Sequence, residues 1–361
     1  MIVGIVGGGQ LARMLALAGY PLGLRFLILD PSPSACARHV AELIQGAYDD
    51  HQKLKQLASG ADVVTFDFEN VPAKAACFLE SLVPVYPPPV ALEVAQDRLF
   101  EKRLFQELHI PTPPFVAVDS LEALQTAVAQ LGLPAMLKTR RLGYDGKGQW
   151  LLRTSHDIPA AWQQLGNTPL ILEGFIPFQR EVSMLALRNH QGSTAFYPLV
   201  ENQHRNGILR LSIAPYPATA LELQARHYAT QLLQRLNYVG LLAIEFFVLN
   251  DQLLVNEMAP RVHNSGHWSI EGAEVSQFEN HLRAILNWPL GHTAAIGHSA
   301  MLNFIGELPD RNTLLAIPGV HFHAYGKTPK PGRKLGHATL RVDDPSTLQD
   351  KLAKLLTLMR Q

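Results

Sequence analysis

A basic, glycine-rich stretch lies in the middle of the chain and reads RRLGYDGKGQ over residues 140–149. The apolar segments on either side of it, 135–138 and 149–152, are typical of β-strands, so we predict a hairpin with the glycines at its tip. Glycine lets backbone N–H groups approach phosphate oxygens closely. Matching positive charge comes from Lys138, Arg140, Arg141 and Lys147. We interpret the stretch as a flap over a nucleotide, with a solvated hairpin as the alternative; a Walker-type loop would have to open a helix.

Two acidic residues lie on a second predicted hairpin. Glu245 is inside the apolar strand predicted over 241–249, and Glu257 ends the returning strand; each is six residues from Asp251. We therefore predict that the two carboxylates face each other, where like charges repel. A divalent cation would offset that repulsion, and an oxygen pair with room for water and phosphate suits Mg²⁺ better than Zn²⁺. The alternatives are a pair that shares one proton and a one-residue register shift that separates the side chains.

The N-terminal segment has the outline of a βαβ unit. A predicted strand over 1–6 leads into the glycine-rich turn Gly7–Ala12, a helix follows, and a second strand over 24–29 ends at Asp30. This order is typical of a doubly wound parallel sheet. The G-x-G-x-x-A pattern with an acid about 20 residues on also fits a dinucleotide site. An NAD-dependent oxidoreductase is therefore one hypothesis, and a tight turn without a dinucleotide is the other.

The chain divides at a proline-rich stretch. Residues 84–89 read PVYPPP, which cannot continue a helix or a sheet, so we predict a domain boundary there. The predicted fold class is α/β, then α+β. Helices are expected over 91–109, 120–132, 221–237 and 275–286. Further strands are expected over 62–68, 135–139, 149–153, 170–173, 181–188 and 252–256.

Composition excludes several classes of protein. The 361 residues include 31 basic and 31 acidic side chains, a balance that disfavours a nucleic-acid partner. Hydrophobic residues make up 47%, which favours a large core over disorder. The longest uncharged run, 284–306, is interrupted by Asn, Pro and His, so no membrane span is predicted. Two cysteines and the lack of a basic leader indicate a cytoplasmic protein. The fifteen His residues are unusual.

Two further segments carry side chains suited to anions. Residues 258–268 read MAPRVHNSGHW directly after Glu257, and a polar loop there suits a small anion and a second substrate. Zinc at His263 and His267 is disfavoured, because Pro260 and Gly266 indicate a loop where that pair would need a helix. Residues 327–337 read KTPKPGRKLGH. Basic side chains on a backbone fixed by proline suit a ligand phosphate, with a solvated loop as the alternative.

These motifs together resemble those of the 5-(carboxyamino)imidazole ribonucleotide synthases, ATP-grasp carboxylases of purine biosynthesis. The resemblance rests on 143–149, 256–268 and 331–337 and extends over nearly the whole chain. It implies a Rossmann-like N-terminal domain over 1–90 that binds substrate and not a dinucleotide. An ATP-grasp domain over 91–290, with a flap-bearing subdomain at about 110–170, and a small C-terminal domain over 291–361 would follow.

The resemblance also implies a reaction. Bicarbonate would carboxylate the exocyclic amine of 5-aminoimidazole ribonucleotide through carboxyphosphate, with ATP as cosubstrate and ADP and phosphate as products. The implied cofactor is Mg²⁺, without biotin. The implied partners are these small molecules and a second copy of the chain in a homodimer, with no nucleic acid and no membrane. A different ATP-grasp ligase or carboxylase, with another acceptor, is the alternative within the superfamily.

By position, the resemblance assigns roles to individual residues. Mg²⁺ would bind Glu245 and Glu257, and Arg261 and His263 would orient bicarbonate or carboxyphosphate, with Asp145 as the candidate base. One departure is Asp67, where the family pattern leads us to expect Glu. The ATP set is Arg98, Lys138, Gly143, Tyr144, Asp145, Gly146, Lys147, Gly148, Gln149, Glu173, Gly174, Phe175, Ile176, Glu181, His204, Asn256 and Glu257. The ribonucleotide set is Glu69, Tyr144, Asp145, Lys147, His263, Asn264, Ser265, Gly266, Lys327, Arg333 and Lys334.

Overall fold

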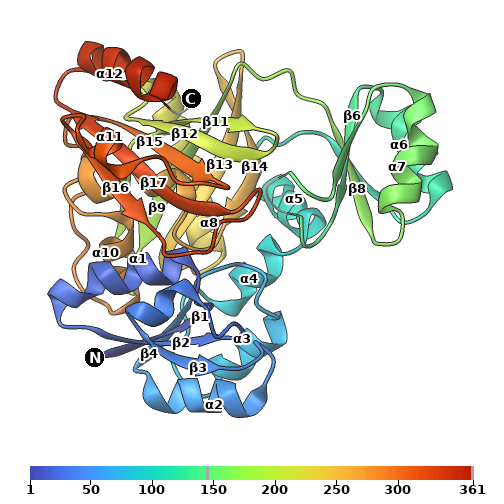
Figure 1. Cartoon of the computed structure of the whole chain (residues 1–361). Coiled ribbons are helices and arrows are strands. Elements are labelled where there is room, and N and C mark those ends of the chain that lie inside the picture. The colour runs from blue at the N-terminus through green and yellow to red at the C-terminus, as the bar shows by residue number, and fades with distance from the viewer. Residues whose placement is uncertain (144–145, 359–361) are drawn as a thin grey trace.

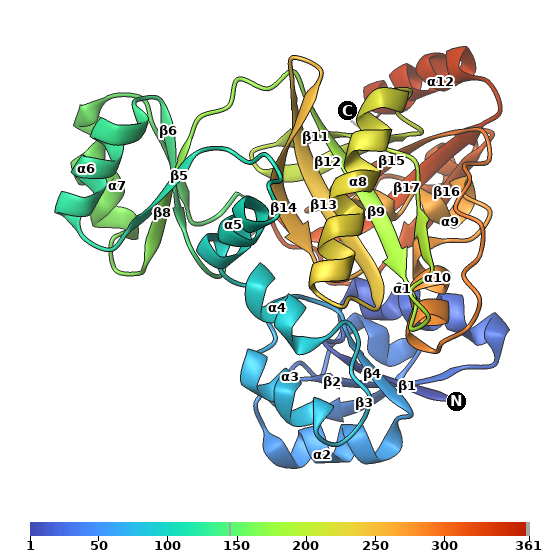
Figure 2. The same cartoon turned by 180° about the vertical axis from the view of Figure 1, so that it is seen from behind.

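The structure, a computed structural model, describes residues 1–143 and 146–358. This part of the chain forms three β-sheets: a parallel N-terminal sheet, a large antiparallel sheet, and a small antiparallel sheet that stands to one side (Figures 1 and 2). The small sheet is joined to the rest near helix α5 (Arg98–Glu107). Among the described residues, no helix is both long and apolar enough to span a membrane. The predicted α/β and α+β class is confirmed.

The N-terminal sheet has the strand order β3-β2-β1-β4, and its neighbouring strands are parallel. Strands buried on both faces of a parallel sheet are almost continuously apolar, and β1 and β4 read IVGIV and VVTF. The predicted βαβ unit is therefore confirmed. Its elements are β1 (Ile2–Val6), α1 (Gln10–Gly19), β2 (Arg25–Asp30), β3 (Glu42–Gln45), α2 (His51–Gly60), β4 (Val63–Phe66) and α3 (Ala73–Glu80).

The helix predicted over 91–109 is two helices, α4 (Pro89–Ala95) and α5. Asp97 separates them, because its side chain accepts the N–H of Leu99 and so begins α5 as an N-cap. Pro89 lies in the first turn of α4, where its missing N–H costs nothing. The proline-rich stretch therefore starts a helix as well as ending the N-terminal sheet.

The small sheet carries the predicted flap. Its strand order is β5-β8-β6-β7, and β6 and β7 pair with Lys138 opposite Gln149. Residues 140–148 therefore connect two strands, as predicted. Its two helices lie on the side away from the central sheet and bury an apolar layer (Figure 1). The elements are β5 (Phe115–Val118), α6 (Leu121–Leu131), β6 (Ala135–Thr139), β7 (Gln149–Leu152), α7 (Ile158–Leu165) and β8 (Leu170–Gly174).

The large sheet forms the centre of the molecule. Its strand order is β14-β13-β9-β11-β12-β15-β17-β16, with β10 beside β9. The strands are β9 (Arg180–Arg188), β10 (Thr194–Phe196), β11 (Val200–Arg205), β12 (Ile208–Ala214), β13 (Gly240–Leu249), β14 (Gln252–Ala259), β15 (His298–Ile305), β16 (Val320–Ala324) and β17 (Lys334–Val342). Pairing between β12 and β15 makes the C-terminal strands a continuation of this sheet.

Helices cover both faces of the large sheet. Helix α8 (Thr219–Arg235) packs on one face, where Met184, Leu242 and Ile244 are buried (Figure 2). Helices α1 and α10 (Gln277–Ile285) pack on the other face, against Leu185 and Leu241. The remaining helices are α9 (Ser269–Gly272), α11 (Arg311–Leu315) and α12 (Pro345–Leu358).

Candidate active site

The two carboxylates predicted to bind metal lie opposite each other on the β13–β14 hairpin, where Glu245 pairs with Glu257. The hairpin turns through Asn250 and Asp251, which have positive φ angles of 51° and 57°, as tight two-residue turns require. A regular hairpin from this turn would place Glu245 opposite Asn256. A β-bulge shifts the register at that point and brings Glu257 into place. The predicted pairing is confirmed, although the turn is centred between residues 250 and 251.

Helix α5 holds the bulge from the side. The buried Lys102 Nζ donates to the carbonyl oxygen of Asn256 at 2.8 Å. The carboxylate of Glu101, also buried, accepts the N–H of Met258 at 2.7 Å. Two consecutive residues of one helix therefore fix the backbone on both sides of Glu257. The spacing of apolar residues gave no indication of this contact, because it joins segments about 150 positions apart.

Arg98 offsets part of the repulsion between the carboxylates. Its guanidinium lies 2.8 Å from Glu257 Oε2. Burial would raise the pKa of Glu257, but Arg98 outweighs it and lowers that pKa to about 2. Burial and the facing Glu257 raise the pKa of Glu245 to about 7. The pair is therefore asymmetric, with Glu257 ionised and Glu245 able to keep a proton near neutral pH until a cation displaces it.

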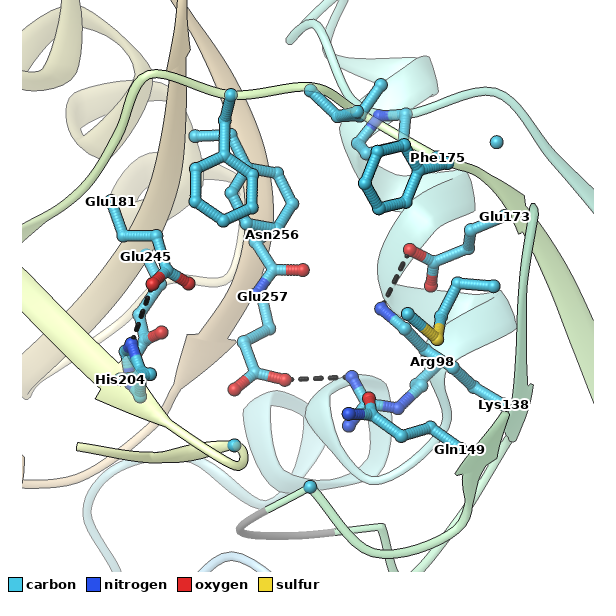
Figure 3. Close-up of a pocket in the computed structure, with 18 of the residues that line it drawn as sticks. Arg98, Lys138, Gln149, Glu173, Phe175, Glu181, His204, Glu245, Asn256 and Glu257 are labelled. Carbon is cyan, nitrogen blue, oxygen red and sulfur yellow. Dashed lines mark hydrogen bonds and ion pairs between the residues drawn. The ribbon is translucent and has the colours of Figure 1, made fainter. Parts of the chain in front are cut away.

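The first cavity lies between the small sheet and the β13–β14 hairpin (Figure 3). On one wall, Lys138 Nζ is 2.9 Å and Lys102 Nζ is 3.7 Å from Glu173 Oε2. Burial would raise the pKa of Glu173, but Lys102, Lys138 and Arg98 outweigh it and lower the pKa to about 2. Glu173 is therefore a fixed anion that compensates the cations around it. The described lining residues include Arg98, Lys138, Gly146, Lys147, Gln149, Glu173, Gly174, Phe175, Ile176, Glu181, His204, Glu245, Asn256 and Glu257.

On the opposite wall, His204 Nδ1 is 3.0 Å from Glu181 Oε2 (Figure 3). Burial would lower the pKa of His204, but Glu181 and Glu245 outweigh it and raise the pKa to about 8. This wall therefore carries a positive imidazolium at neutral pH. Phe178 and Phe247 also line the cavity and stack with their ring centres 4.6 Å apart. Sequence reasoning missed this apolar pair, because Phe178 lies between predicted elements.

The donor atoms beside Glu257 fit a magnesium ion. Both carboxylates supply oxygen, and the buried Asn256 Oδ1 has no hydrogen-bond partner among the described residues. Mg²⁺ prefers oxygen ligands and usually keeps waters and phosphate oxygens in its shell. The described residues form no cluster of three or more His, Cys, Asp or Glu side chains around one point, as a transition metal held by protein alone would need. A hard cation shared with phosphate suits this set better than zinc does.

The second cavity lies where the N-terminal sheet meets the loop after β14. Arg261 and Glu69 form an ion pair within it, and Glu69 outweighs burial to keep the pKa of Arg261 high. Burial, with Arg261 and Lys334, lowers the pKa of His263 to about 3. The Oδ1 and Nδ2 atoms of Asn264 are both buried and lack a partner among the described residues. Its lining includes Gln10, Asp67, Glu69, Arg98, Arg140, Gly143, Glu245, Glu257, Arg261, His263, Asn264 and Lys334.

The two cavities meet at the carboxylate pair. The residues that line both are Arg98, His204, Gly207, Glu245 and Glu257. A ligand in one cavity and a ligand in the other would therefore share one wall of charged groups. That arrangement permits transfer of a chemical group between the two ligands without release of a reactive intermediate into water.

The N-terminal glycine-rich turn is occupied by the protein's own carboxylates. Asp67 accepts the N–H groups of Gly9 and Ala12 at the start of α1, and Asp30 accepts the N–H of Gly8 at 2.8 Å. A Cβ on Gly9 would lie 2.4 Å from Asp67 Oδ2, so glycine is required there for this contact. A dinucleotide would need the same N–H groups for its pyrophosphate. This geometry disfavours the NAD hypothesis and gives Asp67 a role in capping the helix.

Some predicted site residues lie away from the cavities. Ser265 and Gly266 are the buried residues of the loop after β14, and Gly148 packs on Thr139. Of the basic turn, Lys334 lines the second cavity, whereas Lys327 bonds to the side chain of Gln10 and Arg333 to the carbonyl of Thr328. Tyr144 and Asp145 lie outside the described residues.

Comparison with known proteins agrees with this geometry. Family models match residues 1–96 (ribonucleotide synthetase preATP-grasp domain), 103–278 (ATP-grasp domain) and 299–351 (phosphoribosylaminoimidazole carboxylase C-terminal domain). The N5-carboxyaminoimidazole ribonucleotide synthase of Pseudomonas aeruginosa is 55% identical, with 99% of each chain covered. The crystal structure of the Thermus thermophilus synthetase is 57% identical, with a TM-score of 0.95 and 99% and 98% of the chains covered.

A third relative was solved with ligands. The Aspergillus clavatus synthase, in complex with ADP and 5-aminoimidazole ribonucleotide, is 30% identical with a TM-score of 0.93, and 99% and 98% of the chains are covered. The fold and the paired cavities define an ATP-grasp enzyme. Within that class, the chain belongs to the N5-carboxyaminoimidazole ribonucleotide synthase family.

Proposed function

We propose that this enzyme uses ATP and bicarbonate to carboxylate the exocyclic amine of 5-aminoimidazole ribonucleotide, as its family name implies. The observation that carries the proposal is the shared wall, because it lets a phosphate bound in the first cavity meet an acceptor in the second. The proposal includes a cytoplasmic location and a domain boundary near residue 90, as composition and the proline-rich stretch predict. It also includes a homodimer and a boundary near residue 290, both of which rest on the family resemblance.

ATP would bind in the first cavity, with its base between the segment Glu173–Ile176 and the stacked Phe178 and Phe247, and its ribose at Glu181. Lys138 and the flap residues Gly146, Lys147 and Gln149 would contact the phosphates. Glu245 and Glu257 would hold Mg²⁺, which would supply charge neutralisation for the transferring phosphoryl group. Arg98 and the imidazolium of His204 lie on the shared wall and add positive charge on the protein side.

The chemistry would proceed in two balanced steps. A bicarbonate oxygen attacks the γ-phosphorus, the bond to the β-phosphate oxygen breaks, and ADP leaves with that electron pair. The amine nitrogen then attacks the carboxyl carbon of carboxyphosphate, the bond from that carbon to the phosphate oxygen breaks, and phosphate leaves with the electron pair and accepts the proton that the amine loses. Arg261, which pairs with Glu69, and His263 line the second cavity and would orient the anionic oxygens there. Preorganised donors of this kind stabilise charge without reorganisation.

Phosphate release tests the proposal directly. We expect the enzyme to release phosphate from ATP only when both bicarbonate and 5-aminoimidazole ribonucleotide are present. Phosphate release that is indifferent to the ribonucleotide would favour a different ATP-grasp ligase. Tight binding of NADH without binding of ATP and Mg²⁺ would favour the oxidoreductase.

The phosphate of the ribonucleotide would be bound by the basic turn, with Lys334 in the cavity wall. We expect Lys334→Ala to raise the KM for 5-aminoimidazole ribonucleotide about 10- to 100-fold, since a charge-assisted hydrogen bond contributes about 1.5–3 kcal/mol. The KM for ATP should stay within about twofold. Lys330→Ala is the matched control, because that exposed lysine belongs to the same turn but not to the cavity lining. An unchanged KM in Lys334→Ala would mean that the turn does not bind substrate.

A further inference from the structure

A line of buried polar side chains runs beneath the loop that carries His263. Ser212, Asn202 and Ser183 lie on neighbouring strands and on the face of the large sheet that carries Glu245. Ser212 Oγ donates to Asn202 Oδ1, Asn202 Nδ2 to Ser183 Oγ, and Ser183 Oγ to Ser265 Oγ, each at 2.8 Å. All four residues are at most 4% exposed. The line ends at His263, whose Nδ1 lies 2.9 Å from Ser265 Oγ.

The backbone and the hydroxyl of Ser265 both act on His263 Nδ1. The N–H of Ser265 points at Nδ1 from 3.3 Å and favours a lone pair there, but this contact is longer than the 2.9 Å contact of the Ser265 hydroxyl, so the preference depends on the hydroxyl as well. Ser265 Oγ can then donate its hydrogen to the same Nδ1 while it accepts from Ser183. The side chain of Asn202 has one donor group and one acceptor oxygen. Because the hydroxyl of Ser212 donates to the oxygen, the amide nitrogen of Asn202 points at Ser183. A neutral imidazole that accepts at Nδ1 carries its hydrogen on Nε2.

The backbone of His263 is held as well. The buried side chain of Gln277 accepts the N–H of His263 at 2.9 Å and donates to its carbonyl oxygen at 2.6 Å. A Cβ on Gly266 would lie 2.6 Å from Gln277 Oε1, so this clamp requires glycine at that position. The imidazole therefore sits on a fixed backbone, and its orientation depends on the contacts of its two nitrogens.

Nε2 is the nitrogen that faces the shared wall, 3.4 Å from Glu245 Oε1. We propose that the line from Ser212 to Ser265 holds His263 as its Nε2–H tautomer, so that His263 donates a hydrogen bond to the reacting bicarbonate or carboxyphosphate and does not take the proton of the amine. Asn202 and Ser183 are then positioning residues, although neither is among the described residues that line the cavities. The identity of the anion rests on the proposed function, whereas the tautomer does not.

Two substitutions at His263 test whether its side chain acts as a hydrogen-bond donor or as a base. The amide nitrogen of Gln can reach the place of Nε2 and donate, whereas that of Asn reaches only the place of Nδ1. We expect His263→Gln to keep kcat within about tenfold of wild type. His263→Asn should lower kcat by about 10²–10³-fold, the usual effect of removing one preorganised donor. Equal loss of activity in both variants would overturn the donor role.

The tautomer itself can be measured in the ligand-free protein from the ¹⁵N chemical shifts of the His263 ring. We expect wild type to show Nε2–H, and Ser183→Ala and Ser265→Ala to show a mixture of tautomers with kcat lowered about tenfold and an unchanged KM for ATP. Ser299→Ala is the matched control, because it removes a buried hydroxyl of the same sheet that has no partner among the described residues.

The control should leave both the tautomer and kcat unchanged. Hydrogen on Nδ1 in wild type, or an unchanged tautomer in both serine variants, would overturn the inference. Because this measurement needs neither ATP nor ribonucleotide, its failure is distinguishable from failure of the proposed function, which phosphate release tests.

Discussion

Glu257→Gln is expected to lower kcat by at least about 10²–10³-fold while leaving the chain folded. Gln keeps the shape of the side chain but removes the negative charge that Arg98 contacts at 2.8 Å and that Mg²⁺ would share with Glu245. Loss of one well-placed electrostatic group in a phosphoryl-transfer site costs about 3–4 kcal/mol of transition-state stabilisation. The fold should persist, since the change also removes the like-charge contact with Glu245.

Steady-state kinetics and ADP binding, measured by calorimetry with and without Mg²⁺, check this expectation. Wild type should bind ADP more tightly with Mg²⁺, and the variant should lose most of that gain. Glu222→Gln is the control, because Glu222 forms a pair with Arg226 on the surface of α8, outside both cavities. Near-normal kcat in Glu257→Gln, with circular dichroism like that of wild type, would contradict the metal assignment.

The position of Glu257 shows what the sequence could predict. Counting from the turn placed Glu257 opposite Glu245, and the structure has that pair. The count assumed a turn centred on Asp251, whereas the actual turn is one residue shorter. The count succeeded because a bulge near Asn256 compensates for that difference, and Glu101 and Lys102 of α5 hold the bulge. Alternation of apolar residues reports which face of a strand is buried. It does not report contacts from another element, so the bulge could not be anticipated.

The glycine-rich turn at Gly7–Ala12 shows what a local motif cannot predict. Its local pattern is compatible with a dinucleotide site and with a tight turn in a substrate-side domain. Asp67, which decides between them by accepting the N–H groups of Gly9 and Ala12, directly follows strand β4, 55 or more positions away. Local motifs predict the strand, turn and helix. Which ligand such a turn binds depends on tertiary contacts. The family resemblance indicated a substrate-side domain, whereas the sequence of the turn alone left both hypotheses open.

Three of the His residues that remained unexplained by sequence make structural contacts. His337 stacks on His323 with ring centres 4.4 Å apart, and His323 lies 2.6 Å from Glu271. His281 is buried against Thr65, and burial lowers its pKa to about 3. Only partners distant in the sequence distinguish these roles from that of His263. Composition therefore showed that His is abundant but not which His residues reach the cavities.

Glu173→Gln is expected to lower the free energy of unfolding by about 3–5 kcal/mol, the usual cost of removing one partner from a buried ion pair. The Glu173 side chain is 3% exposed and lies within 3.7 Å of the ammonium groups of both Lys102 and Lys138. Burial lowers the pKa of Lys102 even with Glu173 present, so the charged form of this lysine is already destabilised. Without the carboxylate, the buried cations would lose the charge that compensates them.

The pH dependence of this effect follows from the same contacts. Lys102, Lys138 and Arg98 outweigh burial and lower the pKa of Glu173 from 4.5 to about 2, which corresponds to about 3 kcal/mol of stability. Because the folded-state pKa is depressed, this contribution is complete above about pH 4.5 and is lost as the pH falls toward 2. The difference in unfolding free energy between wild type and Glu173→Gln should therefore be constant from pH 7 to 5 and narrow below 4.5.

Urea denaturation at a series of pH values measures that difference. Glu107→Gln is the matched control, because Glu107 pairs with Arg235 at 2.9 Å but is 56% exposed. An exposed pair contributes about 0–1 kcal/mol, so the control should stay close to wild type at every pH. A loss in Glu173→Gln no larger than in the control, or a difference that does not change below pH 4.5, would show that the cations do not depend on Glu173.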